Sequence, residues 1–197
     1  VVFAIEKAAE AYGFDKKIAR YGAILHDIGK ASTIFQERLK PRYKKNEAQK
    51  AYRHELASLF FISLFEENIQ PILIEMIVAH HKSIESDPRG KGILDLEENI
   101  EDVFSLHKDG WETWSNDAMK ILNTFNIKTH KITLSEAEEN YYKAVAYSER
   151  IVETQGYSEW KGLLMAADHF ASAMINNTAK QTKNLFKQPN LVFFERQ

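Results

Sequence analysis

ILHDIGKAS, residues 24–32, carries an apolar helical pattern straight into a histidine and an aspartate and then breaks it at Gly29. Such a pair is poor core material, because burying a carboxylate without a partner is costly. Lys30 follows at once and adds a third polar side chain. His26 and Asp27 are therefore either a pair of metal ligands or a pair that meets by chance, and the segments around them decide between the two.

Apolar residues recur at helical spacing through most of the chain. The pattern predicts helices over residues 1–12, 15–29, 54–68, 70–82, 136–156 and 159–177. Gly13 is typical of a helix C-terminus, Ser135 with Glu138 reads as a capping box, and Ser158 is a candidate N-cap. Irregular segments are expected near 40–50, 82–96 and 107–116, and the one strand-like run is NLVFFE at 190–195. The predicted fold class is all-α.

Composition bounds the class of protein. The 197 residues are 44% hydrophobic and 27% charged, as in a globular domain, and no apolar run is long enough to cross a bilayer. The absence of cysteine excludes disulfides and thiolate metal sites, and the net charge of −2 gives no overall attraction to nucleic acid. We expect a cytoplasmic protein without membrane contact, with one domain over 1–178 and a linker over 179–197.

Histidines gather where the predicted helices begin or end. His26 closes one helix beside Asp27, His54 opens another, and His80 with His81 ends a third. Asp168 lies among small residues on a later helix, where a buried carboxylate needs a partner or a metal. A single histidine is more often a hydrogen-bonded structural residue, but imidazole and carboxylate together are the ligands of hydrolytic zinc, manganese, iron, cobalt and nickel sites.

The combined pattern LHDIGK, RHE, AHH and AADHFAS over residues 25–172 resembles the HD nuclease domain of the CRISPR type I effector helicase–nuclease. That domain belongs to the HD superfamily of metal-dependent phosphohydrolases. The resemblance implies an HD-like helical bundle with a metal site at converging helix ends. It also implies an endo- and exonuclease that hydrolyses single-stranded DNA in CRISPR interference, with a helicase domain or subunit and a Cascade-type surveillance complex as partners.

The resemblance also implies roles for individual residues. Asp27 corresponds to the carboxylate that bridges two metals, and Lys30 to a catalytic lysine near the scissile phosphate. One ion would be held by Asp27, His54, His80 and His81, and the other by Asp27, His26 and Asp168 with a histidine from the family's first helix. No histidine precedes His26 here, so that ligand is expected upstream of residue 1. The expected cofactor is one or two divalent ions of manganese, iron, nickel, cobalt or zinc, and magnesium also fits.

The substrate prediction rests on local charge. The segment from Arg38 to Arg53 holds seven lysines and arginines and a single acidic residue, Glu47. It could follow a DNA backbone, or it could be a solvated loop. The candidate nucleic-acid contacts are Lys40, Arg42, Lys44, Lys45, Arg53 and, from the resemblance, Ser172. No Walker-type phosphate-binding sequence is present, so any ATP-driven helicase activity lies outside this chain.

Two other functions fit the same residues. The first is an HD phosphohydrolase that acts on nucleotides or cyclic nucleotides. The second is a non-catalytic module in which the metal joins the helices and the domain serves for docking.

Overall fold

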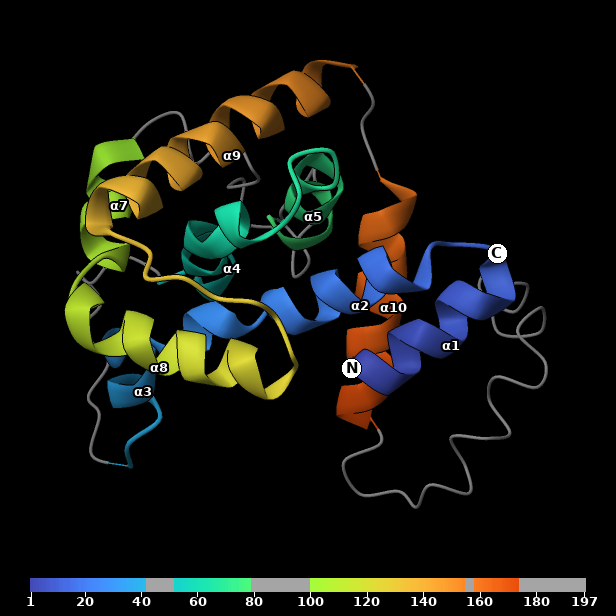
Figure 1. Ribbon diagram of the computed structural model, residues 1–197, viewed down its shortest axis with the longest axis horizontal. Helices are drawn as coiled ribbons and strands as arrows, with labels where there is room; N and C mark the ends of the chain where they lie inside the picture. Colours follow the sequence, from blue (N-terminus) through green and yellow to red (C-terminus); the bar gives the residue numbers. More distant parts are fainter. Residues whose placement is uncertain (42–51, 79–99, 155–157, 174–197) are drawn as a thin grey trace.

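The computed structural model describes residues 1–41, 52–78, 100–154 and 158–173, and within them every regular element is helical (Figure 1). This confirms the all-α prediction. The expected irregular segment 82–96, nearly all of 40–50, the strand-like run 190–195 and the linker over 179–197 lie outside the described residues. Among the described helices, none combines the length and hydropathy that crossing a bilayer requires.

Some elements follow one another directly, as η2 follows α4, whereas residues 125–133 separate α8 from α9. In chain order they are α1 (Val2–Tyr12), α2 (Lys16–Leu25), the 3₁₀ turn η1 (Ile28–Ala31), α3 (Thr33–Arg38), α4 (His54–Ser58), the 3₁₀ segment η2 (Leu59–Leu64), α5 (Gln70–Ile77), α7 (Ile100–His107), α8 (Trp111–Thr124), α9 (Leu134–Thr154) and α10 (Glu159–Ala173).

Two groups of helices build the bundle. α1 packs against α2 and α10, and α10 also packs against α5, so the last described helix lies beside the first two. On the other side, the long helix α9 covers η2 and α5, while α8 packs on η1 (Figure 1). The 3₁₀ turn η1, which follows His26 and Asp27, therefore packs against helices that are distant from it in the sequence, α4 and α8.

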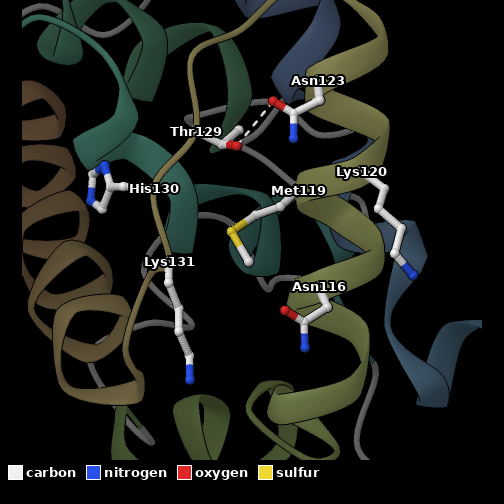
Figure 2. Close-up of a pocket in the computed structure, with 7 residues that line it drawn as sticks. All are labelled: Asn116, Met119, Lys120, Asn123, Thr129, His130 and Lys131. Carbon is white, nitrogen blue, oxygen red and sulfur yellow. Dashed lines mark hydrogen bonds between the residues drawn. The ribbon is translucent and has the colours of Figure 1, made fainter.

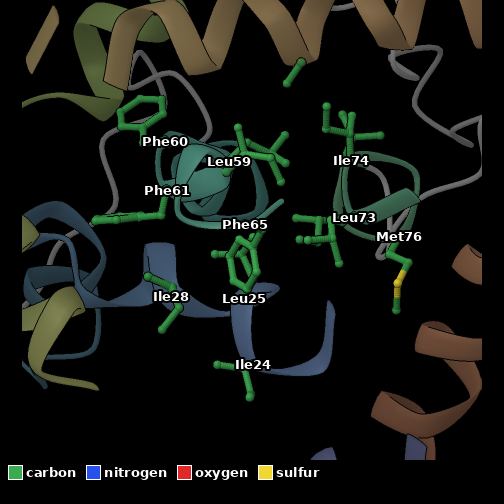
Figure 3. Packing of buried hydrophobic residues seen from close by; sticks show 14 of the residues in the cluster. Ile24, Leu25, Ile28, Leu59, Phe60, Phe61, Phe65, Leu73, Ile74 and Met76 are labelled. Carbon is green, nitrogen blue, oxygen red and sulfur yellow. The ribbon is translucent and has the colours of Figure 1, made fainter. Parts of the chain in front are cut away.

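The core is centred on η2. Leu59, Phe60, Phe61 and Ile62 are all buried, and they pack against residues of α2, η1 and α5 (Figure 3). On the α8 side, Phe61 lies against Trp111, with ring centroids 5.4 Å apart. Burial of each large apolar side chain contributes about 1.5–3 kcal/mol. This core holds the ends of α2 and α4 in a fixed relation.

Several predicted boundaries differ from the structure. The helix expected over 15–29 already ends at Leu25, where the chain turns into η1. The helix expected over 54–68 turns into a 3₁₀ segment after Ser58, whose hydroxyl lies 3.0 Å from the His54 carbonyl oxygen, a side-chain bond of the kind that bends helices. The region 107–116 is helical except for a short turn at Gly110, which has a positive φ of 70°. The cap of α9 is Thr133, not Ser135, because the Glu136 N–H donates to the Thr133 hydroxyl oxygen.

Candidate metal centre

The His26–Asp27 pair lies where α2 stops. Leu25 is the last residue of α2, and Asp27 has φ −107° and ψ 1°, which turns the chain into η1. Gly29 then lies so close to α4 that a Cβ on it would be 2.0 Å from the carbonyl oxygen of His54. Glycine is therefore required here by the close approach of two backbones rather than by its φ angle. This contact brings the turn that carries His26 and Asp27, which we call the HD turn, against His54, the residue that begins α4.

Ser58 fastens the same two elements. Its buried hydroxyl accepts a hydrogen bond from the Gly29 N–H at 2.8 Å and is placed to donate to the carbonyls of His26 at 2.9 Å and His54 at 3.0 Å. Tyr52 adds a bond from its phenolic O–H to the carbonyl of Gly29 at 2.9 Å. The backbone of the HD turn is thus held from α4 and from the residues just before it.

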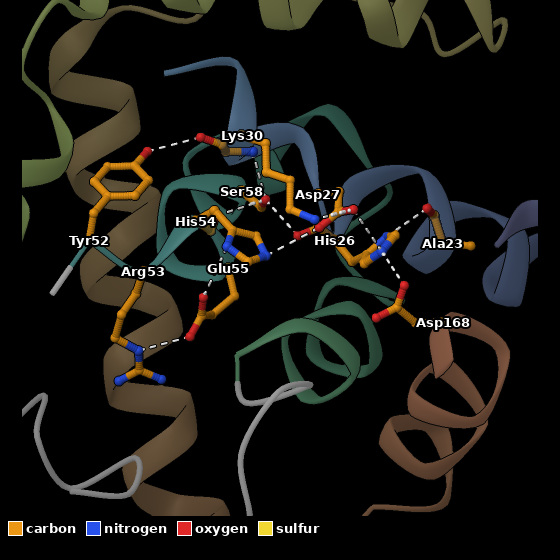
Figure 4. A network of polar contacts seen from close by, with 11 residues as sticks. Ala23, His26, Asp27, Lys30, Tyr52, Arg53, His54, Glu55, Ser58 and Asp168 are labelled. Atoms are coloured by element: carbon orange, nitrogen blue, oxygen red, sulfur yellow. Dashed lines mark hydrogen bonds and ion pairs between the residues drawn. The ribbon is translucent and has the colours of Figure 1, made fainter. Parts of the chain in front are cut away.

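His26 is buried, and its two ring nitrogens face different groups. Nδ1 lies 2.8 Å from the carbonyl oxygen of Ala23. Since a carbonyl oxygen can only accept, Nδ1 carries a proton, and Nε2 of the neutral ring presents a lone pair. Nε2 lies 3.3 Å from Asp27 Oδ2 and 3.8 Å from Asp168 Oδ1 (Figure 4). A lone pair facing two carboxylates needs a cation between them, either a proton or a metal.

The two carboxylate oxygens of Asp27 face two different histidines. Oδ2 faces His26, and Oδ1 lies 3.2 Å from Nε2 of His54. The Lys30 ammonium also reaches Oδ2, at 2.8 Å. Burial acts to raise the pKa of Asp27, but His54, His26 and Lys30 outweigh it and hold the pKa below its usual value. The carboxyl group is therefore ionised at neutral pH, as a metal ligand must be.

His54 has a carboxylate on each side of its ring. Nε2 faces Asp27, while Nδ1 lies 3.7 Å from Oε2 of Glu55, within ion-pair range but beyond hydrogen-bond distance. Phe35 packs on the ring edge-on, with centroids 5.6 Å apart. Glu55 in turn accepts from Nε of Arg53 at 2.9 Å. The imidazole is thereby held between the HD turn and a buried ion pair.

Asp168 joins the group from far along the sequence. It lies on α10, with its side chain only 15% exposed, and that helix packs against α1, α2 and α5. Ala167 beside it is buried against neighbouring helices. The long-range meeting of His26 and Asp168 was expected from the sequence, and the structure brings them within 3.8 Å.

The donor set fits divalent metal ions. Two donors that each lie about 2.1 Å from one ion are separated by roughly 3.0–3.4 Å, close to the His26–Asp27 and His54–Asp27 separations. Asp27 Oδ1 is buried, and the group that it faces is Nε2 of His54 at 3.2 Å. Those residues do not complete a site: no three His, Asp or Glu side chains in the described ranges share one centre with metal-site geometry. His80 and His81, the other proposed ligands, lie outside the described residues.

Of the candidate nucleic-acid contacts, one is buried, two are exposed and three lie outside the described residues. Arg53 is a correction, because its guanidinium is buried and paired with Glu55, which leaves it no surface to offer a backbone. Lys40 is exposed and paired with Glu37, and Ser172 is exposed on α10. The remaining three lie outside the described residues: Arg42, Lys44 and Lys45.

Three supporting residues escaped the sequence analysis. Glu55 and Ser58 follow His54 in a helical pattern that shows only that they share its helix. His107 is buried, and its Nε2 accepts from the N–H of Arg53 at 2.9 Å while Nδ1 donates to Val103. Burial lowers the pKa of His107 to about 4, so the ring is neutral and structural. The only available signal was the pair of opposite charges flanking His54.

A hollow of about 490 Å³ lies elsewhere, between α8 and residues 129–131 (Figure 2). Several of its polar side chains already have partners: Thr129 donates to Asn123 within the hollow, and Lys120 pairs with Asp117 beside it. None of the candidate ligands lines it.

Comparison with known proteins supplies the family. The family model described as HD domain matches residues 1–111, more than half of the chain, and this range includes the HD turn, α4 and His107. Neither the search of curated proteins nor the search of solved structures found a match. The chain therefore belongs to the HD domain family, whose members are in general hydrolases of phosphate esters that bind divalent metals.

Proposed function

We propose that this protein is a metal-dependent phosphodiesterase that cleaves single-stranded DNA at the centre around Asp27. One observation carries the proposal: the two oxygens of Asp27 face imidazole nitrogens of two different elements, at 3.3 Å from His26 and 3.2 Å from His54. A carboxylate placed in this way can hold two cations, one through each oxygen. Asp168 would complete one side, and His80 and His81 the other.

The residues of the chain contribute in different ways. His26 and His54 offer imidazole nitrogens, which carry no negative charge, so they would give affinity for a cation without cancelling its charge. When divalent ions are bound, they supply the positive charge that lowers the pKa of water and offsets the charge of the phosphodiester. Lys30, whose side chain is partly exposed, would add a positive charge close to the developing negative oxygens.

Single-stranded DNA is proposed on two grounds. The motifs around His26, His54 and Asp168 resemble those of the CRISPR type I nuclease domain, and the segment after Arg38 is rich in lysine and arginine. Asp27 is one-third exposed, which leaves the centre open to a ligand from solvent. We further propose that the domain works in CRISPR interference, where a helicase would feed it the strand that a surveillance complex has opened.

Circular single-stranded DNA tests the substrate. The full chain with Mn²⁺ should cut the circles and then degrade the linear product, and Asp27→Ala should abolish both activities. Intact circles together with hydrolysis of nucleotides or cyclic nucleotides would replace the nuclease by a nucleotide phosphohydrolase. Metal binding without hydrolysis of either substrate would favour the docking module. Equal DNase activity in Asp27→Ala would assign the cleavage to a contaminant.

A further inference from the structure

Arg53 and Glu55, which flank His54 in the sequence, form a buried ion pair. Their side chains are 9% and 4% exposed, and Nε of Arg53 donates to Oε1 of Glu55 at 2.9 Å. Burying two charges carries a large desolvation cost that their attraction must offset, and apolar residues of similar volume often stabilise a fold as well or better. Stability alone is therefore a poor reason for these two residues at this place.

The geometry divides the Glu55 carboxylate between two partners. Oε1 is occupied by Arg53, which leaves Oε2 directed at Nδ1 of His54, 3.7 Å away (Figure 4). A carboxylate behind the far nitrogen of a ligating histidine orients the ring and makes the other nitrogen a better donor. Here the other nitrogen is Nε2, the one that faces Asp27.

Arg53 itself is fixed from two further elements. Its Nη2 donates to the carbonyl oxygen of Val78 at 3.3 Å, and Val78 is the residue that closes α5. Its backbone N–H donates to Nε2 of His107, on α7. The start of α4 is thereby tied to the end of α5 and to α7, so Glu55 cannot easily leave its place behind His54.

We propose that the buried Arg53–Glu55 pair is a positioning element for metal binding, which holds the His54 imidazole with its Nε2 toward Asp27. This inference rests on the proposed metal centre. In this proposal the arginine and the glutamate of the RHE motif together orient the histidine between them. The proposal also explains why Arg53 is buried although it follows a basic segment.

Removal of the arginine separates positioning from simple charge. Arg53→Gln takes away a positive charge, so electrostatics alone would make the protein bind a cation more tightly. If Arg53 positions His54 through Glu55, the same change weakens binding. We expect Mn²⁺ to bind about 10- to 100-fold more weakly to Arg53→Gln in isothermal titration calorimetry, as is usual when a group behind a ligand is lost.

A matched control exists at the interface of α1 and α2. Arg20 donates to Glu6 at 2.8 Å in another arginine–glutamate pair, and Arg20→Gln should leave the Mn²⁺ affinity unchanged. The visible spectrum of the Co²⁺-loaded protein should change in Arg53→Gln and stay the same in Arg20→Gln, because it reports the arrangement of ligands. If Arg53→Gln does not fold, Arg53→Lys keeps the charge but loses the planar contact, and it should also bind more weakly.

The two proposals fail in different ways. Wild-type protein that binds no Mn²⁺ would overturn the metal centre and the positioning role together. Wild-type protein that binds Mn²⁺, with a folded Arg53 variant that binds it equally or more tightly, would overturn the positioning role and leave the proposed function intact.

Discussion

Replacing Gly29 by alanine would place a methyl group 2.0 Å from the carbonyl oxygen of His54 and 2.8 Å from Cβ of Ala57. Neither contact can be relieved by rotating a flexible side chain, because one neighbour is backbone and the other is a Cβ. The turn that carries His26 and Asp27 would have to move away from α4. The change thus tests whether the close approach of these two elements builds the site.

The loss of stability expected for Gly29→Ala follows from these two contact distances. The methyl group must retreat by about 1 Å before the carbonyl oxygen reaches 3.0 Å, below which real Cβ contacts essentially do not occur. Overpacking of this kind costs about 1–3 kcal/mol. The same movement strains the bonds from the Gly29 N–H to Ser58 and from Tyr52 to the Gly29 carbonyl, and losing one such bond costs about 1 kcal/mol. We expect the free energy of unfolding to fall by about 2–4 kcal/mol.

Urea denaturation and calorimetric titration with Mn²⁺ measure the two consequences. Gly29→Ala should unfold at lower urea and bind Mn²⁺ at least about 10-fold more weakly, because His26 and His54 have moved apart. Gly162→Ala is the matched control: a Cβ there meets nothing within 4 Å, and alanine should stabilise α10 by about 0.5–1 kcal/mol. A Gly29→Ala protein as stable as wild type, with unchanged Mn²⁺ affinity, would refute the reasoning.

Three further predictions concern single side chains. Ser58→Ala removes a hydroxyl that contacts three backbone groups, so urea titrations should show the free energy of unfolding lowered by about 1–3 kcal/mol. A variant as stable as wild type would show that these hydrogen bonds are dispensable. Burial lowers the pKa of His107 to about 4, so as the pH falls the unfolded chain binds this proton before the folded protein does. The folded protein therefore loses up to about 3 kcal/mol of stability, which is fully present above pH 6.5 and disappears as the pH falls toward 4. Urea midpoints of metal-free protein against pH should therefore fall less steeply in His107→Phe, and parallel curves would contradict this. Lys30→Met should slow cleavage of single-stranded DNA about 100-fold with undiminished Mn²⁺ affinity, because Lys30 is a cation beside Asp27 and not a ligand; unchanged cleavage would remove it from the mechanism.

Much of the helical architecture follows from local patterns. Gly13 ends α1 with φ 76°, and the Ser158 hydroxyl lies 3.5 Å from the Lys161 N–H at the start of α10, both as the sequence predicts. The cap of α9 was misplaced because TLSE, residues 133–136, and SEAE, residues 135–138, carry the same signature two positions apart. Local chemistry cannot choose between such neighbours when the packing of the helix decides.

The sequence predicted that the candidate ligands would meet, but it did not predict the residues that support them. His26, Asp27, His54 and Asp168 carry a chemistry that stands out on apolar helices, and the structure brings them together. Arg53 was assigned to the surface because its neighbours in sequence are basic, whereas its burial depends on contacts with Val78 and His107, which are 25 and 54 residues away. Such contacts leave no periodic trace in the sequence.

Anomalous scattering from crystals grown with Mn²⁺ tests the central claim most directly. The account predicts a manganese peak within bonding distance of the Asp27 carboxylate and of Nε2 of His26 or His54. It would be contradicted by crystals that contain Mn²⁺ but show no peak at Asp27, or by a peak bound only to other residues.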